Sequence, residues 1–376
     1  MKPEERETAI ELMMRFAERT GLTSKTPTRR YLWTDAFAVC NFLELGRLKG
    51  DERYRSLALQ LVDQVHHVLG SHHTDDSRTG WISGLGEDEA HPTRGGLRIG
   101  KALPERGASE PFERELEWNR DGQYFHYLTK WMHALHQVSR STGQARYHTW
   151  ARELAEVSHE AFMCEGRRGM FWKMSIDLTR PLVPSMGHHD PLDGFITCVQ
   201  LQTTTPALSS GSSEPSLQAA VADFAAMIEG GEWTTTDPLG LGGLLTDAAR
   251  VAQLMRRGAF AGSDLLTILL NAAERGLSHY ASYTDTREPG QRLAFRELGL
   301  AIGLSALELI EKAGDPRYAE LRELIEALSR HVELGSNIKA FWLDPGHRQA
   351  RTWSEHRDIN DVMLATSLVP AGFLVL

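Results

Sequence analysis

Two histidines and two carboxylates stand close together in the segment MGHHDPLDGF, residues 186–195. His188 and His189 can act as acid or base, because imidazole titrates near neutral pH. Asp190 and Asp193 could form an acid and base pair. An aspartate followed by proline is, however, also a typical helix start, with Asp190 as the N-cap and Asp193 in the first turn. The sequence therefore favours capping for the aspartates and proton transfer for the histidines.

Other carboxylates stand at the starts of apolar helical segments. Packed side by side, such helices could bring these carboxylates to a common site. Hydrolysis of a glycosidic bond needs one protonated carboxyl group and one ionised partner. The same carboxylates could instead complement the helix dipoles. The candidate catalytic residues are Asp121, His188, His189, Asp190, Glu297 and Asp358.

Most of the tryptophans lie in long connections between helical segments or at their edges. Flat aromatic rings with a polar edge suit the faces of sugar rings. The alternative is that the aromatics of GMFWKMSID and IKAFWLD belong to short β-ribbons that pack against the helices. The candidate substrate-binding residues are Trp33, Asp35, Trp81, Arg94, Tyr124, Trp172, Trp342, His347, Trp353, His356 and Arg357.

No metal or cofactor is expected. SHHTDD at 71–76 and GHHDPLD at 187–193 offer nitrogen and oxygen ligands, but neither places two histidines one helical turn apart. The glycine-rich stretch at 94–107 lacks the Gly-Lys-Ser/Thr ending of a phosphate-binding loop. Its basic side chains could contact an anionic substrate group or pair with nearby acids.

The elements that would position these residues are pairs of helices. Three segments repeat a tight turn, an Arg-Tyr pair and an amphipathic helix, and Gly50, Gly143 and Gly314 stand where a helix C-cap is expected. The helices before these turns are apolar nearly all round, as buried helices are. The expected inner helices are 35–48, 121–141, 190–203, 239–256, 292–312 and 358–374, and the expected outer helices are 4–19, 52–69, 144–163, 215–228, 263–279 and 315–331.

Six helical hairpins predict an all-α fold, the (α/α)6 toroid, with short β-ribbons in its long loops. The chain resembles the six-hairpin glycosidase-like superfamily, which includes N-acylglucosamine 2-epimerases and unsaturated glucuronyl hydrolases. DPGHRQ at 344–349 is similar to a Pro-Gly-His element of the epimerases. The resemblance covers the whole chain and implies one domain, 1–376, in which helix 4–19 closes the ring with helix 358–374.

The expected function is a glycoside-hydrolase-type activity on a small sugar or oligosaccharide, with Asp121 or Asp190 paired with Glu297 or Asp358. The first alternative is a sugar 2-epimerase or isomerase. In the epimerases of this superfamily two opposed histidines exchange the proton, which implies His188 or His189 facing His347 or His356. The second alternative is a toroid without catalysis that binds a glycan or a partner.

Composition limits the partners. The net charge of −9 and the absence of a polybasic run argue against nucleic acid or a membrane surface as partner. The first twenty residues carry acids throughout and lack the apolar core of a signal or anchor. Three widely spaced cysteines suit reduced thiols, so a cytoplasmic location is expected. The sequence leaves the oligomeric state open.

Overall fold

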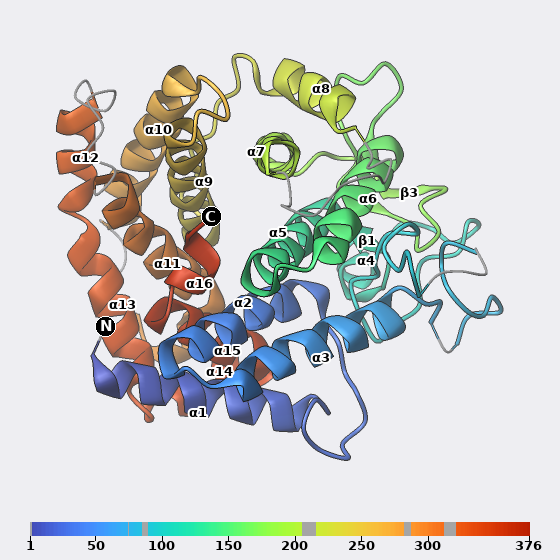
Figure 1. Ribbon diagram of the computed structural model, residues 1–376, viewed down its shortest axis with the longest axis horizontal. Helices are drawn as coiled ribbons and strands as arrows, with labels where there is room; N and C mark the ends of the chain where they lie inside the picture. Colours follow the sequence, from blue (N-terminus) through green and yellow to red (C-terminus); the bar gives the residue numbers. More distant parts are fainter. Residues whose placement is uncertain (1, 74, 85–88, 205–215, 282–286, 312–320) are drawn as a thin grey trace. The chain divides into compact units, whose positions relative to one another are not determined.

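The computed structural model describes residues 2–73, 75–84, 89–204, 216–281, 287–311 and 321–376 (Figure 1). The chain forms two compact units. The first unit is Ala17–Gly230, and the second unit combines Met1–Phe16 with Gly231–Leu376. Helix α1 (Pro3–Arg19) contains the boundary between them.

The first unit consists of helical hairpins. Helix α2 (Leu32–Lys49) pairs with α3 (Glu52–Leu69), α5 (Phe125–Thr142) with α6 (Ala145–Phe162), and α7 (Asp190–Thr203) with α8 (Gln218–Ile228). Helix α5 also lies against α2 and α7, so the first helix of each hairpin is the inner one (Figure 1). This confirms the predicted alternation of inner and outer helices in this unit.

Glycine ends two of these inner helices, as predicted. Gly50 follows α2 with φ 62° and Gly143 follows α5 with φ 71°, a left-handed conformation that costs other residues more than glycine. The predicted Gly314 turn and the start of the predicted 315–331 helix lie outside the described residues.

The second unit is centred on α9 (Pro238–Arg256) and α11 (Ala294–Glu311), which pack on each other. Helix α9 also contacts α10 (Ser263–Ala281), and α11 contacts α12 (Arg322–Ser329), α13 (Val332–Leu343) and α15 (Arg357–Leu368). The α9–α11 contact is made by backbone. A Cβ at Gly242 would lie 2.1 Å from the Gly299 carbonyl oxygen, and one at Gly303 would lie 2.5 Å from the Gly242 oxygen.

Two sequence predictions fail in the second unit. The IKAFWLD segment is part of helix α13 and not a β-ribbon, because Ile338 and Trp342 form one buried stripe at helical spacing. The predicted helix 358–374 is broken, with α15 followed by the short α16 (Ala371–Leu374), because Pro370 cannot continue a helix. Three further short elements in this unit are α14 (Arg351–Glu355) and the 3-10 turns Pro289–Gln291 and His347–Gln349.

The first unit contains a small antiparallel sheet, whose first strand directly precedes α5 in the sequence. Its order is β1 (Gln123–Tyr124), β2 (Lys173–Met174) and β3 (Pro181–Val183), with Tyr124 paired to Lys173. The β-ribbon predicted for GMFWKMSID is therefore confirmed. Because β1 runs directly into α5, the sheet fixes the start of that helix.

Buried charges connect this sheet to the loop before it. Lys173 has no exposed side-chain surface, and its Nζ donates to Glu117 Oε1 at 2.9 Å, from the short helix α4 (Arg114–Asn119). The other oxygen of Glu117 accepts from Arg106 Nε at 2.8 Å. Two cations thus share one buried carboxylate.

None of the described helices is both long enough and apolar enough to cross a membrane.

We predict that Glu117→Leu destabilises the protein by about 3–5 kcal/mol, because it leaves Lys173 and Arg106 without their shared counter-charge. The measurement is urea unfolding followed by circular dichroism. Glu115→Leu is the matched control, because Glu115 lies exposed on the same short helix, and a shift within about 0.5 kcal/mol is expected there. Equal shifts in the two variants would contradict the prediction.

Candidate functional site

The first helical residue of α7 and the first turn of α5 bring Asp190 close to His126. The Nδ1 atom of His126 lies 3.7 Å from Asp190 Oδ1, and Asp190 is 5% exposed. Neither His126 Nδ1 nor Asp190 Oδ2 has a hydrogen-bond partner among the described residues, although both atoms are buried. Buried polar atoms without partners are rare in folded proteins, so this pair is a candidate ligand or proton-transfer site.

The capping predicted for Asp190 is wrong. The N-cap position of α7 is His189, and no side chain caps the helix there. The neighbouring Asp193 faces α5 instead of its own helix, and its Oδ2 accepts from Thr129 Oγ1 and, at 2.6 Å, from Lys130 Nζ. The same prediction is confirmed at Asp237, whose Oδ2 accepts from Gly240 N at 2.9 Å at the start of α9.

The surroundings move two pKa values in opposite directions. Burial, followed by the charge of Asp193, raises the pKa of Asp190 to about 7. Burial, followed by the charge of Lys130, lowers the pKa of His126 to about 4. Near neutral pH the imidazole is therefore uncharged while the carboxyl group is close to half ionised. Such a carboxyl can both accept and return a proton.

An aromatic wall, defined as Trp118, Tyr124, Tyr127 and Trp172, lies beside the imidazole. The ring of His126 is nearly parallel to Trp172, at 11° with centroids 6.2 Å apart, and Tyr124 lies 5.1 Å from Trp172. Trp118 packs on Trp172 at 5.4 Å and is 50% exposed. The side chain of His126 keeps 30% of its surface exposed. Of these rings Trp118 is the one most open to a solute, whereas Tyr124 is 3% exposed and packs against Trp118 and Trp172 within the cluster.

His188 and His189 lie just before Asp190, as the sequence requires. Their rings stack at 4.5 Å with an angle of 31°. His188 is exposed and His189 partly exposed, so solvent reaches the approach to the carboxyl group. Their proposed proton-transfer role stays a prediction.

Two predicted catalytic carboxylates are held by arginines, and an acid and base role for them stays a prediction. Asp121 is fully buried, pairs with Arg98, and accepts from the backbone N–H groups of Gly100 at 3.0 Å and Lys101 at 3.3 Å. It is therefore an anchor for the loop.

Glu297 is in the same situation in the second unit. Both of its oxygens accept from Arg292, at 2.8–3.0 Å, and Oε2 also accepts from Trp342 Nε1 at 2.9 Å. A carboxylate that already accepts from these donors has little hydrogen-bonding capacity left for a substrate.

Several predicted binding residues are core residues. Trp33, Trp342 and Trp353 are at most 6% exposed, with Trp33 packed on Phe37 and Trp353 on Trp342. Asp35 is 1% exposed and accepts from the Tyr31 backbone N–H at 2.9 Å. These four side chains are part of the packed core of their units, and substrate binding by them stays a prediction without a structural basis.

The remaining predicted residues are nearer the surface. Trp81 packs on His67, Arg94 donates to the buried Glu153, and His347 stacks on Phe341 at 3.9 Å. In the second unit His356 contacts Phe295, Arg357 is exposed and Asp358 is partly exposed. For Tyr124 and Trp172, which belong to the aromatic wall, substrate binding stays a prediction with a structural basis.

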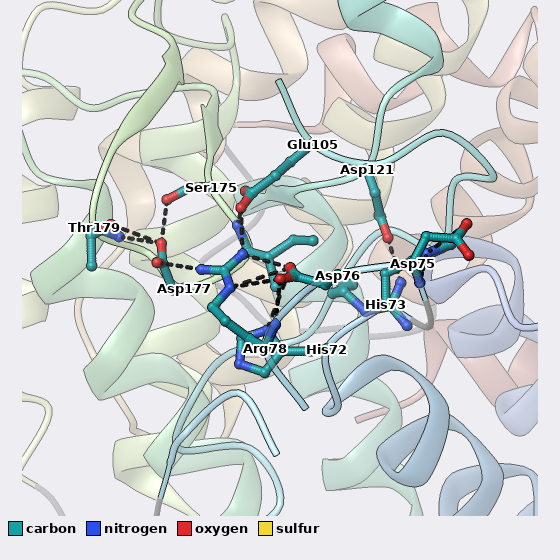
Figure 2. Close-up of polar contacts among 12 residues, drawn as sticks. His72, His73, Asp75, Asp76, Arg78, Glu105, Asp121, Ser175, Asp177 and Thr179 are labelled. Atoms are coloured by element: carbon teal, nitrogen blue, oxygen red, sulfur yellow. Dashed lines mark hydrogen bonds and ion pairs between the residues drawn. The ribbon is translucent and has the colours of Figure 1, made fainter. Parts of the chain in front are cut away.

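The SHHTDD segment is organised around an arginine. Figure 2 shows Arg78 between three carboxylates, with Nη2 2.7 Å from both Asp76 Oδ2 and Glu105 Oε1 and Nη1 2.6 Å from Asp177 Oδ2. His72 Nδ1 lies 3.9 Å from Asp76 Oδ2. In the part of the chain that the structure describes, no group of three or more histidine, cysteine or acidic side chains is arranged to hold a metal ion.

The sequence places His126 one turn into the inner helix 121–141, but Thr129 and Lys130 are not among the candidate residues. His126, Thr129 and Lys130 are three and four residues apart, so they share one face of a helix, and all three stand in its first two turns. The helix carries other polar residues, so the spacing alone does not single out these three.

Comparison with known proteins gives a fold. No protein-family model and no curated protein matches the sequence. Among solved structures, a D-mannose isomerase matches with a TM-score of 0.55 and 11% identity over 98% of each chain. A cellobiose 2-epimerase from Spirochaeta thermophila DSM 6192 gives a TM-score of 0.49 and 12% identity over 97% of this chain and 98% of its own. The isomerase match confirms the predicted (α/α)6 fold class.

The raised pKa of Asp190 predicts a pH-dependent stability. The folded protein holds this proton up to about pH 7, whereas the unfolded chain releases it near pH 4. Folding stability contributed by the protonated carboxyl is therefore lost as the pH rises between these values, by up to about 4 kcal/mol at roughly 1.4 kcal/mol per pH unit.

Asp190→Asn removes this ionisation, so we expect the variant to gain stability over the wild type between pH 4.5 and pH 8 in urea unfolding. Asp63→Asn, at an exposed carboxylate on α3, is the control and should follow the wild type at both pH values. A constant difference between Asp190→Asn and the wild type would show that Asp190 titrates normally.

Proposed function

We propose that this chain is a carbohydrate-active enzyme that moves a proton at C2 of a reducing sugar, as a sugar isomerase or 2-epimerase does. The observation that carries the proposal is the buried Asp190 carboxyl group, which titrates near neutral pH next to an uncharged imidazole. Proton abstraction beside a carbonyl needs a base with such a pKa and a neutral donor that polarises the carbonyl oxygen.

In the proposed reaction Asp190 is the base and His126 is the hydrogen-bond donor. In the open-chain aldose, the Asp190 carboxylate takes the proton from C2, and the C2–H electrons form the C1–C2 double bond of an enediolate. A ring N–H of the neutral His126 donates to the O1 oxygen as negative charge develops there. Lys130 holds Asp193 by an ion pair of 2.6 Å, and the charge of Asp193 contributes to the raised pKa of Asp190.

The fate of the proton decides between isomerase and epimerase. If Asp190 returns it to C1 while the proton of the O2 hydroxyl passes to O1, the aldose becomes a ketose. If a second acid protonates C2 from the opposite face, the product is the epimer. His188 or His189 could supply that proton. The paired-histidine arrangement with His347 or His356 stays a prediction.

The fold comparison favours the isomerase. The D-mannose isomerase with the same fold is, by its name, an enzyme of this reaction class. Glycoside hydrolysis, the main expectation from sequence, loses support because Arg98 holds Asp121 and Arg292 holds Glu297. The aromatic wall supports sugar binding under either function.

The test is proton NMR of D-mannose, D-glucose and D-fructose incubated with the protein in D2O. We expect solvent deuterium at C1 or C2 together with interconversion of the sugars. Asp190→Asn should lower the rate by about 10²-fold or more, and His126→Gln by about 10-fold or more. In the wild type, kcat/KM should rise with pH through about 7 as Asp190 ionises.

Asp63→Asn, which removes an exposed carboxylate on α3, is the control and should react at the wild-type rate. Sugar release from p-nitrophenyl glycosides without deuterium incorporation would replace this proposal by the hydrolase. If calorimetry shows that the protein binds a sugar but neither reaction occurs, the proposal is replaced by the alternative of a glycan-binding protein without catalysis.

A further inference from the structure

One lysine, Lys101, lies near the aromatic wall. The ammonium group of Lys101 lies over the Tyr31 ring, 5.5 Å from its centroid. Across the residues that the structure describes, no carboxylate and no hydrogen-bond acceptor pairs with the Lys101 side chain. The side chain is only partly exposed, and an unpaired charge in such a position is costly.

Other cations hold the carboxylates of Asp121 and Glu117. Arg98 pairs with Asp121, and Arg106 and Lys173 share the single carboxylate of Glu117. Burial, followed by the charge of Lys173, lowers the pKa of Lys101, and the charge of Asp121 opposes this shift.

A series of aromatic contacts connects Lys101 to the proton-transfer residues. The hydroxyl oxygens of Tyr31 and Tyr127 are 2.7 Å apart, and their rings are 5.5 Å apart at an angle of 72°. Tyr127 in turn contacts the His126 ring, edge to face at 4.8 Å. A sugar chain lying along these rings would have its reacting carbon near His126 and its far end toward Lys101.

We propose that the substrate of the Asp190 site is an anionic sugar, with a carboxylate or phosphate group at the end remote from the carbonyl carbon, and that Lys101 binds this group. The inference rests on the proposed function for the location of the reacting carbon. Lys101 is a specificity residue in this scheme and takes no part in proton transfer. The hydrogen-bonded Tyr31 and Tyr127 hydroxyls lie between the two ends.

The test compares D-mannose, D-mannose 6-phosphate and D-mannuronate as substrates. We expect the wild type to prefer one of the anionic sugars to D-mannose by at least about 10-fold in kcat/KM. A preference for the phosphate or for the carboxylate identifies the group. Lys101→Met should raise KM for the preferred anionic sugar by about 10- to 100-fold, with kcat little changed and the KM for D-mannose unaffected.

Two controls separate charge from structure. Lys101→Arg keeps the positive charge and should retain most of the affinity that Lys101→Met loses. Lys25→Met makes the same chemical change at an exposed lysine of the first unit and should behave as the wild type. Salt should weaken the binding of the anionic sugar more than that of D-mannose.

The two proposals can fail separately. Sugar conversion with no preference for anionic sugars, or an unchanged KM in Lys101→Met, would overturn the Lys101 inference and leave the proposed function standing. If no sugar reacts, the proposed function fails. Calorimetric titration with D-mannose 6-phosphate and D-mannuronate then still tests whether Lys101 binds an anionic group. Binding of either that is lost in Lys101→Met supports the anion site, and absence of binding overturns it.

Discussion

The carboxylate of Asp121 is the point on which the candidate site depends. It has no exposed surface, and it accepts from the Arg98 guanidinium and from the backbone of Gly100 and Lys101. Two residues later the chain enters β1 and then α5. A single buried anion thus fixes the loop that carries Lys101 relative to the helix that carries His126. A buried pair of this kind adds little net stability, but it is costly to break, which makes it an effective positional constraint.

The buried carboxylates of this unit differ in the hydrogen-bond donors and cations that surround them. Asp121 and Glu117 are buried and fully paired with cations, and Asp193 has a lysine and a hydroxyl group. Asp190 is equally buried, yet its Oδ2 has no such donor. The difference between a structural and a reactive carboxyl group lies in the donors that surround it. An unpaired carboxyl beside a paired one is the arrangement that separates their pKa values.

The sequence predicted the hairpins well because helical periodicity and C-terminal glycines are local signals. The start of α7 at Asp190 and the whole of α3 agree with the prediction. Helix α13 was missed because its apolar stripe is short and its partners lie on α11, which local sequence does not reveal. The fold class was predictable from the pattern as a whole, since many consistent local signals support it.

The site was harder to predict because its decisive contacts are distant in sequence. Asp193 meets Lys130 across 63 residues, and Asp121 meets Arg98 across 23. Nothing beside Asp190 in the sequence distinguishes it from Asp237, which does cap its helix. The aromatic residues show the same limit. Trp172 and Trp342 stand in similar FWK and FWL contexts, but one borders the site and the other is buried.

The backbone contact between α9 and α11 restricts how this protein can vary. Most core positions accept any apolar residue of suitable volume, so a fold can persist while its sequence changes almost completely. Gly242 and Gly303 do not share this freedom, because a Cβ at either would overlap main-chain atoms of the opposite helix. Libraries that randomise these helices should therefore recover glycine at both positions. In the second unit, most core side chains can therefore be exchanged, whereas the glycines at the contact between α9 and α11 cannot.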